Sequence, residues 1–117
     1  MEDLSLNQKV IQKIKEETPE KVKKLMGNDL KKVILYGSCA RGDYTADSDV
    51  DIALITAGDR MSVKKYSEEL AQISTEFAIK FFAIVNFVCL PESEYADKKD
   101  WYGYFRNIAG EGEVLYG

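Results

Sequence analysis

The chain of 117 residues contains no histidine. Histidine is the usual general base near neutral pH and a common ligand of zinc. Its absence excludes His-ligated zinc sites, Ser-His-Asp and Cys-His nucleophile systems, and any histidine general base. Chemistry in this chain must therefore use carboxylates, hydroxyls, lysine, arginine or a metal ion held by oxygen.

Cysteines and long apolar runs are scarce as well. Cys39 and Cys89 form no Cys-x-x-Cys pair and have apolar neighbours, which predicts two reduced packing residues in a cytoplasmic protein. No apolar run approaches the ~20 residues that a membrane-spanning helix needs. The acidic and polar start over 1–10 does not resemble a secretory signal. We therefore expect no membrane association.

Positive charge is also in deficit, with 16 basic against 20 acidic residues and a net charge of −4. Stable nucleic-acid binding needs a basic face, so we expect none. The lysine-rich stretch 21–32 is the local exception, but the nearby Glu16, Glu17 and Glu20 offset it, which favours a solvated helix face. Length and composition predict one domain over 1–117.

Hydrophobic periodicity predicts a small sheet covered by helices. Thr18-Pro19 is typical of an N-cap and first helical position, so we expect a first helix to end and a second to begin there. A continuously apolar run predicts that the third strand is central and buried on both faces. Expected helices cover 6–14, 19–26, 62–78 and 95–108, and expected strands cover 31–37, 49–56 and 81–90. This order predicts an α+β fold with a small mixed sheet flanked by helices.

Two carboxylates stand at the start of the second predicted strand. Asp49 and Asp51 are alternate residues, so they project from one face with α-carbons roughly 7 Å apart. Carboxylates this close repel each other unless a cation lies between them. Without histidine or a thiolate cluster, the cation should be a hard one, Mg²⁺ or Mn²⁺. Because protein-bound Mg²⁺ usually completes its shell with substrate phosphates, we expect a nucleotide as substrate.

Gly37 and Ser38 follow the first predicted strand directly. Glycine lets a phosphate approach the backbone, and "SCAR" opens a turn or short helix whose free N–H groups suit an anion. Ser38 adds a hydroxyl group. Arg41, three residues on, should lie on the same helical face and grip a phosphate oxygen. We therefore predict that Gly37, Ser38 and Arg41 bind the nucleotide.

The stretch "GSCARGDYTADSDVDIAL" resembles the Gly-Ser, ten residues, Asp-x-Asp signature of the polymerase-β-like nucleotidyltransferases. The short length resembles their minimal nucleotidyltransferase (MNT) branch, and the resemblance runs from about residue 8 to the C-terminus. It implies that Gly37 and Ser38 hold ATP or another nucleoside triphosphate, and that Asp49 and Asp51 are catalytic and bind Mg²⁺. Members of this branch are often antitoxins of helical HEPN-type toxins. They resemble enzymes that transfer AMP from ATP to a tyrosine of that toxin.

One expected feature of this family is absent. The wider family adds a third carboxylate on the strand after the next helix, but residues 77–91 contain no acidic residue. The best register places Phe82 at this position, with Asn86 on the same face. Asn86 is either a hydrogen-bonded core residue or a residue near the metals. Two functions stay open: transfer of AMP to a hydroxyl of a partner protein, or a catalytically degenerate domain that binds nucleotide or toxin.

Overall fold

The computed structural model describes residues 6–59 and 61–117. Its strands form one mixed four-stranded sheet. Its strand order is β3-β2-β1-β4. β1 runs antiparallel to both β2 and β4, whereas β2 and β3 are parallel. The strands are β1 (Leu30–Tyr36), β2 (Val50–Thr56), β3 (Val85–Pro91) and β4 (Glu113–Tyr116). The α+β class with a small mixed sheet flanked by helices is therefore confirmed.

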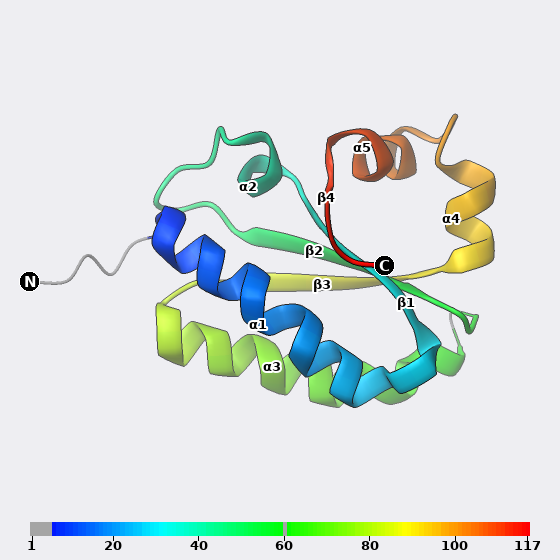
Figure 1. Ribbon diagram of the computed structural model, residues 1–117, viewed down its shortest axis with the longest axis horizontal. Helices are drawn as coiled ribbons and strands as arrows, with labels where there is room; N and C mark the ends of the chain where they lie inside the picture. Colours follow the sequence, from blue (N-terminus) through cyan, green and yellow to red (C-terminus); the bar gives the residue numbers. More distant parts are fainter. Residues whose placement is uncertain (1–5, 60) are drawn as a thin grey trace, which may run out of the picture.

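Helices cover both faces of this sheet, as Figure 1 shows. The long helices α1 (Gln8–Met26) and α3 (Ser67–Phe81) lie on one face, and α4 (Glu92–Lys98) with α5 (Gly103–Glu111) lies on the other. The short α2 (Ser38–Arg41) follows β1, and 3₁₀ turns η1 (Gly27–Asp29) and η2 (Ser62–Tyr66) precede β1 and α3.

The central strand β2 divides the core into two clusters. Ile52 and Leu54 are fully buried toward α1 and α3, whereas Ala53 and Ile55 pack toward α4 and α5. Because side chains alternate between the faces of a strand, Asp51 shares the face of Ala53 and Ile55. That face is covered by α5 only in part, so Asp51 lies half-buried at its uncovered end.

The predicted break in the first helix is wrong. One helix, α1, runs through Pro19, and its N-cap is Asn7, whose side chain accepts from the Val10 N–H at 3.0 Å. Proline inside a helix removes one backbone hydrogen bond and costs ~3 kcal/mol. The helix continues because one apolar stripe spans the proline and packs on the core. Its buried members are Ile11, Ile14, Thr18, Val22 and Met26.

The third strand differs from the prediction in both its start and its position. Residues up to Phe81 belong to α3, and β3 begins only at Val85. β3 is also an edge strand, paired within the described residues with β2 alone. Only Val85, Leu90 and Pro91 of this strand are buried, so its apolar run does not reflect burial on both faces. Instead, the sheet edge faces a groove beside α3.

The C-terminal region also contains more elements than the pattern predicted. The expected helix over 95–108 is two helices, α4 and α5, and the residues after α5 form β4. β4 pairs with β1 and places the C-terminus beside the sheet. None of the helices in the described part of the chain combines the length and apolar character that crossing a membrane requires.

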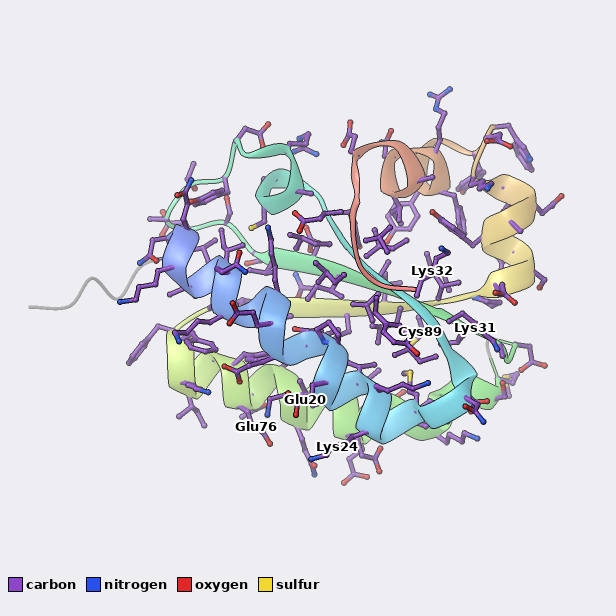
Figure 2. All side chains as sticks on the ribbon, viewed as in Figure 1. Glu20, Lys24, Lys31, Lys32, Glu76 and Cys89 are labelled. Atoms are coloured by element: carbon purple, nitrogen blue, oxygen red, sulfur yellow. The ribbon has the colours of Figure 1, made fainter. Side chains whose placement is uncertain are left out.

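Replacing Pro19 with alanine should stabilise the fold, because alanine restores the N–H that the helix lacks at this position. We expect Pro19→Ala to raise the free energy of unfolding by ~1–2 kcal/mol, after allowing for the greater entropy of the unfolded chain. Urea denaturation measures the change. Glu20→Ala, on the same helix at an exposed position (Figure 2), is the control. Equal stability of the two variants would contradict our account of α1.

Candidate nucleotide and metal site

Asp49 and Asp51 converge on one point at the start of β2. Asp49 immediately precedes the strand and Asp51 is its second residue. The side-chain amide of Asn86 donates to Asp49 Oδ2 at 3.1 Å and to Asp51 Oδ1 at 3.3 Å. A single N–H₂ group thus bridges both carboxylates. The structure agrees with the expectation that the two aspartates share a side.

Asn86, and not Phe82, lies beside the two aspartates. β2 and β3 are parallel, and their register sets Asn86 directly beside Asp51. Phe82 is not in the strand: it ends α3 in the left-handed conformation (φ 56°) with 61% of its surface exposed. The predicted register was therefore wrong. One sequence signal was available, because Asn86 is the only strongly polar side chain between 81 and 90.

Gly37 holds the backbone against Asp51. Its φ of +76° lies in the region that favours glycine. A Cβ at this position would lie 2.8 Å from Asp51 Oδ2. Any side chain would therefore displace the carboxylate or strain the turn. Ser38 is the next residue and the first of α2. Its hydroxyl group therefore belongs to the residue that directly follows this contact.

Arg41 is engaged by two carboxylates. Its Nε donates to Asp43 Oδ2 and its Nη1 to Glu111 Oε2, both at 3.2 Å. The hydrogen bonds that Arg41 donates to Asp43, first, and to Glu111, second, raise the pKa of its guanidinium above the usual value. All three side chains are exposed, so these ion pairs contribute little to stability. Phosphate binding by Arg41 remains a prediction, in which the phosphate takes over from these carboxylates.

Helix α5 forms one wall of the site, which the sequence pattern did not indicate. Tyr36 lies opposite Asp51 in the β1–β2 register, and its hydroxyl lies 3.0 Å from that of Tyr104 on α5. Burial raises the pKa of Tyr36 well above its usual value, and the Tyr104 hydrogen bond and the charge of Asp51 add to this effect. Tyr36 therefore stays neutral beside the carboxylates. Neither Tyr104 nor Glu111 lies near the motif in sequence, so only the fold brings them here.

The donor set fits a hard divalent cation. Among the described residues, no group of three or more His, Cys, Asp or Glu side chains could hold a metal ion. Two carboxylates that reach the same hydrogen-bond donor can also share one cation. Oxygen ligands with open positions for water and phosphate are what Mg²⁺ prefers.

Comparison with known proteins places the chain in a family. The model of the nucleotidyltransferase domain matches residues 11–102. The chain belongs to this family, and it is a nucleotidyltransferase. One relative is a protein of Methanocaldococcus jannaschii that is named as a protein adenylyltransferase by provisional assignment. It is 34% identical over 87 residues, which are 74% of this chain and 79% of the relative. A second protein of that organism with the same description is 27% identical over 68% of this nucleotidyltransferase and 81% of the relative.

Solved structures support the same fold at low sequence identity. A crystal structure of the MntA–HpeT toxin–antitoxin gives a TM-score of 0.55 at 18% identity, covering 87% of this nucleotidyltransferase and 73% of the matched chain. A toxin–antitoxin structure with AMP-PNP gives 0.53 at 20% identity, covering 96% and 74%. A complex of a tri-AMPylated Shewanella oneidensis HEPN toxin with its MNT antitoxin gives 0.51 at 18% identity, covering 91% and 72%.

Changing Asn86 to aspartate should make the stability of the chain depend on Mg²⁺. Asn86→Asp replaces the bridging donor by a third negative charge, so we expect the metal-free melting temperature to fall by about 5 °C. Millimolar Mg²⁺ should restore most of this loss. Asn107→Asp, the same change at an exposed position on α5, should have little effect in either condition. Thermal melts of both variants with and without MgCl₂ test this, and equal metal-free melting of the two would contradict the bridging role.

Proposed function

We propose that this nucleotidyltransferase transfers AMP from Mg-ATP to a hydroxyl group of a partner protein, as an MNT-type antitoxin acts on a helical HEPN-type toxin. The observation that carries the proposal is the convergence of Asp49 and Asp51 on one point beside the Gly37–Ser38 turn. A pair of carboxylates next to a glycine turn and a hydroxyl suits a metal-bound triphosphate.

Each site residue has a defined role in this proposal. Asp49 and Asp51 hold Mg²⁺, or Mn²⁺ in its place. The Gly37 backbone and the Ser38 hydroxyl hold the triphosphate, and Arg41 binds a phosphate oxygen after release from Asp43 and Glu111. When bound, the metal supplies positive charge to the α-phosphate and to the leaving pyrophosphate.

The reaction balances as a single displacement. The acceptor oxygen forms a bond to the α-phosphorus, the bond between that phosphorus and the oxygen bridging to the β-phosphate breaks, and pyrophosphate leaves. The acceptor loses its hydroxyl proton. Asn86 has no basic group to take this proton, so the proton passes to water or to a basic group that the acceptor protein brings. General-base help is typically worth 10²–10⁴ in rate, so small hydroxyl compounds should be poor acceptors.

The names of relatives support the choice of nucleotide and partner. The M. jannaschii relative that aligns over 87 residues is named for the transfer of an adenylyl group to protein. The structural neighbours are toxin–antitoxin proteins, one with AMP-PNP and one whose HEPN toxin carries AMP. The alternative function, binding of nucleotide or toxin without catalysis, is favoured by one observation, the amide of Asn86 in place of a carboxylate.

Nucleotide binding should raise the melting temperature of the chain. A ligand at one hundred times its dissociation constant stabilises the folded state by about 2.7 kcal/mol. We expect Mg-ATP to produce a shift of several degrees, Asp51→Asn to abolish it, and Ser38→Ala to reduce it. The control is Asp47→Asn, which removes an exposed carboxylate from the loop before the site.

The same melts separate the possible outcomes. An unchanged wild-type melting curve at millimolar Mg-ATP would sink both the transfer function and the nucleotide-binding alternative. A shift that Asp47→Asn abolishes as fully as Asp51→Asn would show that loop charge, rather than the paired carboxylates, binds the nucleotide.

AMP transfer should be detectable on a cognate toxin and weak on small acceptors. Mass spectrometry of a HEPN-type partner after incubation with Mg-ATP should show the added mass of one or more AMP groups. The Asp49→Ala, Asp51→Ala double variant should add none. Asn86→Asp should speed transfer to small hydroxyl compounds by up to ~10²-fold, since it supplies a carboxylate beside Asp51. Tight complex formation without added mass would favour the non-catalytic alternative.

A further inference from the structure

The chemistry of transfer determines from which side the acceptor approaches. In an in-line displacement the attacking oxygen and the leaving group lie on opposite sides of the phosphorus. The proposed function places pyrophosphate at the Gly37–Ser38 turn, which follows β1. The strand order β3-β2-β1 puts β1 and β3 on opposite sides of Asp51. The acceptor must therefore approach over β3, where Asn86 lies.

A groove of about 630 Å³ follows that side of the molecule. It runs between β3 and helix α3, and its lining includes Val85, Phe87 and Cys89 of the strand and Leu70 of the helix. Figure 1 shows the two elements side by side, and Figure 2 labels Cys89. Asn86 also lines the groove while it contacts both site carboxylates. Asn86 is thus common to the groove and the candidate site.

The free edge of β3 offers backbone groups to this groove. The carbonyl of Ile84 faces β2, since it accepts from the Val50 N–H at 2.8 Å. Backbone groups alternate in direction along a strand, so those of Val85, Phe87 and Cys89 point away from β2. Ser74 Oγ donates to the Val85 carbonyl at 2.9 Å, as this alternation requires. Along the described chain no strand covers this edge, which leaves the N–H and C=O groups of Phe87 and Cys89 for a ligand.

The charge of the groove limits what can fill it. Among the residues that the structure describes, Lys64 is the only charged one in the lining. It lies on η2, which leads into α3 at the end opposite to Asn86. A nucleic acid would place a phosphate at every nucleotide along this nearly neutral lining, on a chain of net charge −4. A polypeptide with small apolar side chains and one carboxylate opposite Lys64 complements the same lining. The exposed backbone groups match a strand of polypeptide as well.

We infer that the acceptor hydroxyl is carried by an extended segment of the partner protein, which pairs with the free edge of β3 and lies in the groove beside α3. The hydroxyl side chain lies at the Asn86 end and an acidic residue lies at the Lys64 end. This inference rests on the proposed function and adds the form of its substrate. Docking along β3 also supplies the orientation that a site without a third carboxylate needs, since positioning alone lowers a barrier strongly.

A designed peptide tests the inference on the full chain. The probe has about seven residues, the length of β3, with alternating valine and threonine, tyrosine at one end and glutamate at the other. It is made in both chain directions, for parallel and antiparallel pairing. We expect one direction to bind and to slow amide exchange of Phe87 and Cys89 at least tenfold, measured by NMR.

Two pairs of variants locate the bound peptide. Cys89→Pro removes an N–H that points out of the sheet and should weaken peptide binding at least tenfold, whereas Cys89→Ser keeps that N–H and should not. Ala71→Glu places a charge in the groove and should weaken binding similarly. Gln72→Glu adds the same charge to the same helix outside the groove lining and should leave binding unchanged. Ala71→Glu keeps the test valid if Cys89→Pro does not fold.

Several results would overturn the inference. Unchanged exchange at Phe87 and Cys89 with either peptide is one, and equal binding by Ala71→Glu and Gln72→Glu is another. A wild-type dimer that Cys89→Pro converts to monomer would assign the edge to a second copy of the chain. Displacement of the peptide by a short oligothymidylate would assign the groove to nucleic acid. The Mg-ATP melting shift does not involve the groove, so its retention without peptide binding refutes this inference and spares the proposed function.

Discussion

The register between β1 and β2 is the constraint on which the candidate site depends. It sets Tyr36 opposite Asp51 and brings the Gly37 backbone against the Asp51 carboxylate. A slip of one residue would turn Asp51 toward α1 and α3 and bring Ile52 to the site. The core prevents this slip, because Ile52 and Leu54 fill one cluster while Ala53 and Ile55 fill the other. The packing of apolar residues on both faces of β2 thus positions a polar site at its end.

The amide of Asn86 gives this site a balance that three carboxylates would lack. It is neutral, and its N–H₂ group donates to Asp49 and Asp51 at once. The paired negative charges are therefore bridged by a donor before any cation binds. The cost is chemical, because an amide does not accept the acceptor's proton. A site of this kind depends on its acceptor for position and for proton transfer, and the free edge of β3 beside Asn86 is the place where an acceptor reaches it.

Much of the fold and part of the site were predictable from local patterns in the sequence. Apolar spacing identified helices within α1 and α3, and β-branched runs identified β1 and β2. The two aspartates were expected on one side because alternation along a strand is a property of the backbone itself. The missing histidine removed whole classes of chemistry. The Gly-Ser and Asp-x-Asp spacing indicated the family, which the match over 11–102 supports.

Tertiary structure decided the features that depend on contacts between distant residues. Pro19 stays inside one helix because the buried stripe of α1 outweighs a local cost. Asn86 and not Phe82 lies beside Asp51, because the pairing of β3 with β2 begins only after the cap of α3. Tyr104 and Glu111 reach Tyr36 and Arg41 because α5 packs over β1. Composition and spacing thus determined the local elements and the motif. The three-dimensional packing decided which residues face the carboxylates, since the separation of residues along the chain carries no information about these contacts.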